Sequence, residues 1–104
     1  MPDETLDDLL QRPSLRSAVD DLGVQSLGVE DVLVALKAFG AVRLVVDESP
    51  KRPFVCVLTI DGASERGRGS TALHAALKCW AGTLEKMERY TQRGLGELED
   101  FLLA

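Results

Sequence analysis

The segment from Phe54 to Leu84 constrains the fold more than any other part of the chain, because it encodes strands, a tight turn and a helix in one run. Its first residues alternate with the period of two that is typical of a half-buried strand. The Asp61-Gly62 pair then favours a type I′ turn, since both central residues of that turn have positive φ. We therefore expect an antiparallel hairpin with strands at about residues 54–60 and 63–68.

A long helix is predicted after the hairpin, from about residue 70 to residue 91. Ser70 or Thr71 can cap its first turn. Gly94 is expected to end this helix, and a short separate helix is expected at about residues 96–103. The long helix carries a narrow apolar stripe that we expect to pack on the sheet. The stripe consists of Leu73, Leu77, Trp80, Leu84 and Met87.

The region before the hairpin contains helical periodicity followed by a strand pattern. Pro13 and Gly23 mark helix boundaries, Ser14 is expected to cap the second helix, and from Ala41 the apolar period changes from 3.6 to 2. Short helices are predicted at about residues 3–11, 14–22 and 29–39, and a first strand at about 42–48. The chain is thus predicted to form a single α+β domain over residues 1–104, in which the long helix packs on a three-stranded antiparallel sheet.

The outward face of the predicted sheet carries Val45, Val55 and Val57. These valines would form an exposed apolar strip unless another part of the molecule covers them. We expect residues 1–39 to cover the strip, which would give three layers. A homodimer is the alternative.

Charge is distributed unevenly along the 104 residues, although the net charge is only −5. Residues 1–31 hold eight acids and two bases, residues 32–93 hold ten bases and six acids, and residues 94–104 hold three acids and no base. A basic middle between acidic ends predicts a site for an acidic partner, whereas simple solvated faces are the alternative reading. No apolar run approaches the roughly 18 residues of a membrane span, so we expect a cytoplasmic protein without membrane contact.

Residues with catalytic or metal-binding chemistry are sparse. Cys56 and Cys79 do not form a CxxC motif, and His74 is the only histidine. We expect two reduced, partly buried thiols and a histidine at the edge of the apolar stripe with its ring partly solvated. The prediction is accordingly a protein with no enzymatic activity, no metal and no cofactor.

Residues 36–84 place a helix, three strands and a helix in sequence, with the strands in the segment RLVVDESPKRPFVCVLTIDGASERGRGS. This order resembles the double-stranded-RNA-binding domain family, and similar units recur in small bacteriophage and mobile-element proteins. The resemblance implies an α-β-β-β-α fold and duplex-RNA binding through a loop after the first strand and lysines at the start of the last helix. Here that loop reads Ser49-Pro50-Lys51-Arg52, and the last helix has no lysine before Lys78. The family's phosphate contacts are therefore missing from this helix.

A second resemblance, to winged-helix transcription regulators, covers residues 19–62. The positions that carry it are Val19, Leu22-Gly23-Val24, Val29, Val32, Leu36, Gly40 and Val42-Arg43. The resemblance implies DNA binding by the second helix of a helix-turn-helix. Glu30 and Asp31 occupy groove-facing positions, which leaves Gln25 and Ser26 as base readers and the wing as a source of positive charge.

We expect a binding protein that acts on a protein partner or by self-association, as an accessory or inhibitory factor of phage or mobile-element type. The alternative is a nucleic-acid-binding regulator. The residues predicted to contact the partner or the nucleic acid are Arg43, Lys51, Arg52, Arg66 and Arg68. Self-association would use the apolar residues of the C-terminal segment, which are Leu98, Phe101, Leu102 and Leu103.

Overall fold

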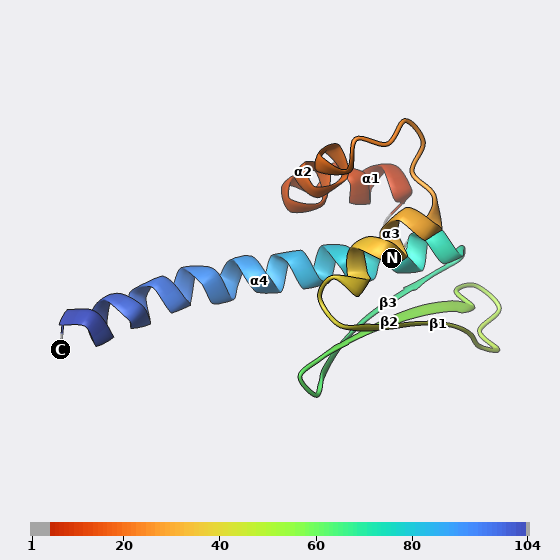
Figure 1. The fold of residues 1–104 in the computed structure, drawn as a ribbon. Coiled ribbons are helices and arrows are strands. Elements are labelled where there is room, and N and C mark those ends of the chain that lie inside the picture. The colour runs from red at the N-terminus through yellow and green to blue at the C-terminus, as the bar shows by residue number, and fades with distance from the viewer. Residues whose placement is uncertain (1–4, 104) are drawn as a thin grey trace.

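A computed structural model gives the fold of residues 5–103 and describes the side chains of residues 5–88. The elements are α1 (Leu6–Leu10), α2 (Pro13–Leu22), α3 (Val29–Lys37), β1 (Ala41–Val46), β2 (Phe54–Ile60), β3 (Ala63–Gly69) and α4 (Ala72–Leu103). The sheet is antiparallel with strand order β1-β2-β3, and α4 packs against it (Figure 1). The predicted α+β class is confirmed.

The β2–β3 hairpin forms as the sequence predicts. Asp61 has φ 48° and Gly62 has φ 83°, the two positive values that a type I′ turn requires. The turn sets the register by placing Ile60 opposite Ala63. After the hairpin, the side-chain oxygen of Thr71 accepts a hydrogen bond from the backbone N–H of His74 at 3.1 Å and caps the start of α4.

Helix α4 runs without interruption to Leu103, so the predicted end near Gly94 and the separate helix at 96–103 are wrong. An isolated glycine costs about 1 kcal/mol relative to alanine in a helix interior, and that cost alone does not end a helix. No proline follows Gly94 to enforce an end. In Figure 1 the C-terminal part of α4 extends well beyond the rest of the fold.

Helix α3 ends at Lys37 rather than at residue 39. Three further predicted boundaries shift for local reasons. Helix α1 begins at Leu6 because the Thr5 hydroxyl accepts from the N–H of Asp8, and the predicted start at residue 3 lies outside the described residues. Ser14 does not cap α2, because Pro13 occupies the first position of that helix. Strand β1 ends at Val46, where the following residues turn into the β1–β2 loop.

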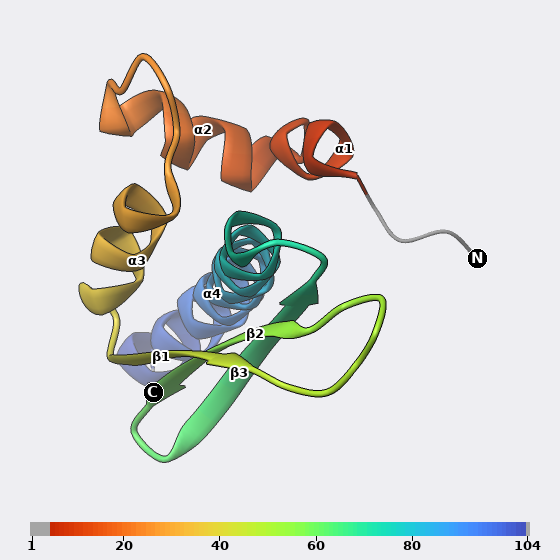
Figure 2. The same ribbon diagram turned by 90° about the vertical axis from the view of Figure 1, so that its right-hand side faces the viewer.

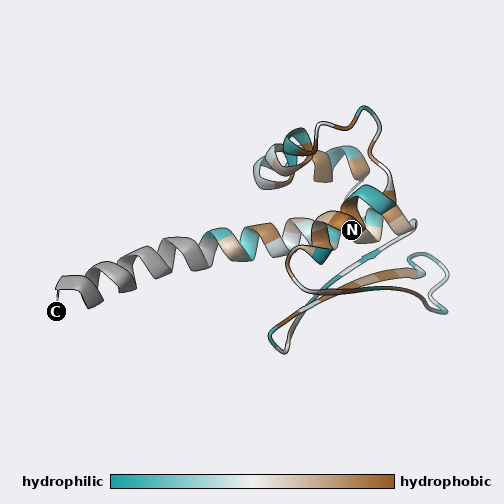
Figure 3. Ribbon diagram, viewed as in Figure 1, coloured by the Kyte–Doolittle hydropathy of each residue, from teal (hydrophilic) through white to brown (hydrophobic). Residues whose placement is uncertain are grey.

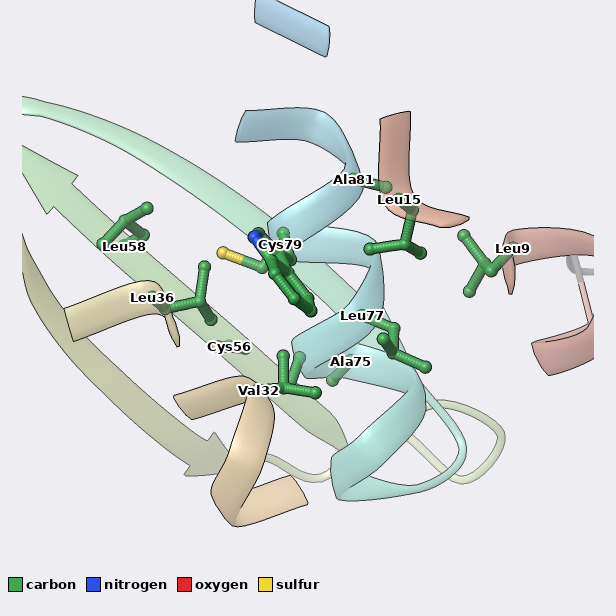
Figure 4. Close-up of a cluster of buried hydrophobic side chains, with 12 residues drawn as sticks. Leu9, Leu15, Val32, Leu36, Cys56, Leu58, Ala75, Leu77, Cys79 and Ala81 are labelled. Carbon is green, nitrogen blue, oxygen red and sulfur yellow. The ribbon is translucent and has the colours of Figure 1, made fainter. Parts of the chain in front are cut away.

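Helix α4 lies in the middle of the molecule, with the sheet on one side and α1 and α2 on the other (Figures 1 and 2). The side of α4 toward the sheet is lined by small residues. A Cβ atom on Gly67 of β3 would lie 2.2 Å from Ala75 O and 2.3 Å from Cys79 N, so helix and strand backbones are in direct contact there. Leu77 lies on the other side with Leu9 and Leu15 (Figure 4).

The expectation that the leucine stripe packs on the sheet is therefore wrong. Small residues allow a helix to approach a strand closely, and the larger side chains fill the wider space toward α1 and α2. The fully buried large side chains come from both layers, and they are Leu9, Leu15, Leu36, Leu58, Leu77, Val32, Cys56 and Cys79. Figure 3 shows hydrophobic residues along β1 and β2 and a hydrophilic β1–β2 loop. Among the described residues, no helix is both long and apolar enough to cross a membrane.

Candidate binding face

The face of the sheet that points away from α4 is built from alternate residues of all three strands. Residues directly opposite each other in an antiparallel pair share a face. Cys56 and Leu58 are fully buried toward α4, so their neighbours along β2 point to the other side. The register places Val57 between Arg43 and Arg66, and Val55 between Val45 and Arg68. We call these six residues the outer sheet face.

The β1–β2 loop, which carries Lys51 and Arg52, is tied to one end of this face. Arg68 Nη1 donates a hydrogen bond to Arg52 O at 3.1 Å and forms an ion pair with Asp47. The structure therefore brings together the basic residues that the sequence suggested as contacts. Arg43, Arg66 and Arg68 lie on the outer sheet face, and Lys51 and Arg52 lie on the adjoining loop.

Asp47 reduces the positive charge at one end of this surface. The N–H of Ser49 donates to Asp47 Oδ1 at 2.9 Å, and this bond, together with the Arg68 guanidinium, lowers the pKa of Asp47. The carboxylate is thus held in its charged form and offsets part of the Arg68 charge. Arg43 and Arg66 are exposed nearby. The surface is positively charged toward Arg43 and Arg66, and near the loop Asp47 offsets part of the positive charge.

The expected covering of the valines by residues 1–39 is wrong. Helices α1 and α2 pack on α4, and α3 lies against α4 and the start of β1, so all described helices are on the opposite side of the sheet (Figures 1 and 2). Val55 is nearly buried among its neighbours in register, but Val45 remains 40% exposed. Residues 5–39 therefore leave the outer sheet face open.

The two cysteines meet inside the core, a juxtaposition that sequence reasoning missed. Cys56 lies opposite Gly67 in the sheet, and the backbone of Cys79 crosses directly over Gly67. The neighbouring Cys79 thiol lowers the pKa of Cys56, and the Cys56 thiol together with burial raises the pKa of Cys79, whose Sγ donates to Glu65 O at 3.5 Å. The hairpin register predicted from Asp61-Gly62 already placed a glycine opposite Cys56, which is the signal that could have located the pair.

His74 is buried rather than partly solvated, with 7% of its surface exposed. Its side chain lies over Gly69, where an added Cβ would come within 2.8 Å of His74 Cβ. Among the described residues, His74 Nε2 and Trp80 Nε1 have no hydrogen-bond partner. Across that same part of the chain, no three His, Cys, Asp or Glu side chains gather as a metal-binding group. The Nε2 atom of this buried histidine therefore makes no hydrogen bond to any described residue.

Both thiols are expected to be unreactive toward 5,5′-dithiobis(2-nitrobenzoate) in the native protein, because both are fully buried and thiol reactivity requires access. Val24→Cys provides a matched control, since Val24 is 39% exposed on the α2–α3 loop. The control thiol should react rapidly, and the two native thiols should react only after unfolding in guanidinium. Fast reaction of a native thiol would show that the core opens readily.

No family model, curated protein or solved structure matches the chain. The resemblances to the double-stranded-RNA-binding domain and to winged-helix regulators therefore stay predictions from the sequence. The side chains predicted for self-association, which are Leu98, Phe101, Leu102 and Leu103, lie outside the described side chains.

Proposed function

We propose that the chain is a non-catalytic binding protein that docks an acidic surface of a protein partner on its outer sheet face. The observation that carries this proposal is the open sheet face on which Arg43, Arg66 and Arg68 surround valines. Arginine beside apolar side chains is typical of protein interfaces, where arginine is enriched and often contributes a large share of the binding energy.

A nucleic acid is the second candidate, and the position of Lys51 and Arg52 next to the three arginines favours it. Together these five bases could contact successive phosphates. The six residues of the outer sheet face, however, include no aromatic side chain on which a base could stack. We therefore place the protein partner first.

The proposal includes an accessory or inhibitory role of phage or mobile-element type, exerted in the cytoplasm. Its support is the small size of the chain, the separation of basic and acidic regions and the apolar residues near the C-terminus. Self-association through Leu98, Phe101, Leu102 and Leu103 belongs to the same proposal.

A photo-crosslinking amino acid at Ser64 tests the proposal in the native host. Ser64 is exposed and lies opposite Thr59, in the row next to Arg43 and Arg66 on the same face. We expect protein adducts at Ser64 that fall at least about tenfold in the Arg43→Glu/Arg66→Glu variant, because like charges across an interface are strongly unfavourable. The crosslinker at Val24 should give none of these adducts.

Arg16→Glu is the matched charge-reversal control, since Arg16 is exposed on α2, away from the sheet. This variant should leave the adducts unchanged. Protein adducts that survive reversal of Arg43 and Arg66 would overturn the proposal. Adducts to nucleic acid, with tight and steeply salt-dependent binding of a duplex that Lys51→Glu/Arg52→Glu weakens, would establish the second candidate instead.

A further inference from the structure

Strand β1 lies at the edge of the sheet, and the hydrogen bonds of the chain show which of its backbone groups are unused. The N–H of Asp47 donates to Pro53 O at 2.7 Å, so residue 47 is bonded toward β2. Bonded and non-bonded positions alternate along an antiparallel strand. Val42, Leu44 and Val46 therefore direct their N–H and C=O groups away from β2, toward the open edge.

The side chains of β1 are unusually apolar for an edge strand. Leu44 is 38% exposed and Val46 is 66% exposed, and Arg43 is the only charged residue between Ala41 and Val46. The pairing of β1 with β2 continues without a bulge, and the strand contains no proline. Natural sheets usually protect their edges with charges, proline or bulges. The other edge strand, β3, follows that rule, because it carries the charged residues Glu65, Arg66 and Arg68.

We propose that β1 pairs with β1 of a second copy, antiparallel about a two-fold axis that places Val45 opposite the partner's Val45. A two-fold axis requires a strand that complements itself. In this register Leu44 lies opposite the partner's Val46, and Arg43 lies opposite the partner's Asp47. Each Arg43 then faces the partner's Asp47, which also keeps its ion pair with Arg68 of its own chain, and four exposed apolar side chains are matched at once. A register centred on Leu44 would instead place Arg43 opposite valine.

Pairing in this way joins the two sheets into one sheet of six strands. With neighbouring strands about 4.8 Å apart, the combined sheet would be roughly 24 Å wide. The outer sheet faces of the two copies become continuous, and each contributes Arg43, Arg66 and Arg68. The inference rests on the edge of β1 and holds whether or not the outer sheet face binds an acidic partner.

Sedimentation equilibrium over a wide range of protein concentrations tests the inference on the full chain. We expect a dimer that dissociates on dilution. Val45→Lys places two lysines opposite each other at the axis and should raise the dissociation constant at least about tenfold. Val24→Lys is the matched control, because Val24 has nearly the same exposure, at 39% against 40%, and lies on the α2–α3 loop. It should leave the dissociation constant unchanged.

Val45→Cys tests the register itself. Residues opposite each other in a non-hydrogen-bonded pair have Cα atoms about 4.5 Å apart, within the range of a disulfide. Mild oxidation should therefore convert Val45→Cys to a covalent dimer, whereas Val24→Cys should stay monomeric on a non-reducing gel. A monomer at every concentration would overturn the inference. So would a dimer that Val45→Lys leaves intact, since another surface would then hold the copies together.

Discussion

Gly67→Ala is expected to destabilise the fold strongly, because the added methyl group would overlap two backbone atoms of α4. The new Cβ would lie 2.2 Å from the carbonyl oxygen of Ala75 and 2.3 Å from the amide nitrogen of Cys79. Both atoms belong to the backbone of α4, so no side-chain rotation can relieve the contact. The helix must move off β3, and its packing on the sheet is lost with it. We expect a loss of at least about 3 kcal/mol in the free energy of unfolding.

Urea unfolding monitored by the fluorescence of Trp80 measures this loss, because Trp80 is the only tryptophan and is buried. Gly28→Ala is the matched control. An added Cβ at Gly28 would lie 3.5 Å from Asp31 Oδ2, which is ordinary van der Waals contact. Gly28 precedes α3, so its replacement should cost no more than about 1 kcal/mol. Equal costs for the two variants would contradict the close approach of α4 to β3.

The elements that sequence predicts best here are those fixed by local chemistry. Asp61-Gly62 allows positive φ at two successive residues, and this property sets the turn and the register of β2 with β3. Thr71 can accept a hydrogen bond from the first turn of the helix, which locates the start of α4. These signals depend on a few neighbouring residues, so the printed sequence contains all the information they need.

The predictions from the sequence were wrong where the structure depends on which elements pack against which side of α4. Both sides of α4 are buried, so a periodic stripe of leucines could not show which side meets the sheet. The side of α4 with Ala75 and Cys79 meets the sheet, because Gly67 has no side chain and lets the backbones of β3 and α4 come into contact. The helices before β1 then pack on the leucine side of α4, and the outer sheet face stays open.

In the candidate site, too, local sequence patterns were informative and tertiary contacts were not predictable. Alternation puts Arg66 and Arg68 on one side of β3 and Arg43 beside Val45 on one side of β1, and the register found in the structure brings these three arginines to the same face. The tie between Arg68 and the β1–β2 loop could not be predicted, because it depends on the path of the chain around Asp47 and Arg52. The meeting of Cys56 with Cys79 needed the position of α4 on the sheet, which the stripe misassigned.

Leu77→Ala is expected to cost about 2–5 kcal/mol in the free energy of unfolding, the range for removing a large aliphatic side chain from a packed core. Leu77 is fully buried and lies with Leu9 and Leu15 in the layer between α4 and the N-terminal helices (Figure 4). The loss should therefore detach α1 and α2 as well as weaken α4. Urea unfolding and hydrogen exchange of the α1 and α2 amides measure the two effects separately.

Met87→Ala is the informative comparison, because Met87 belongs to the same apolar stripe as Leu77 but is 43% exposed. If the stripe packed on the sheet along its whole length, both substitutions would be costly. In the observed arrangement α4 passes out of the core toward its C-terminal end, so Met87→Ala should cost less than about 1 kcal/mol. Similar losses for Leu77 and Met87 would contradict the central position of α4, whereas a large difference would show that only the first part of the helix joins the two layers.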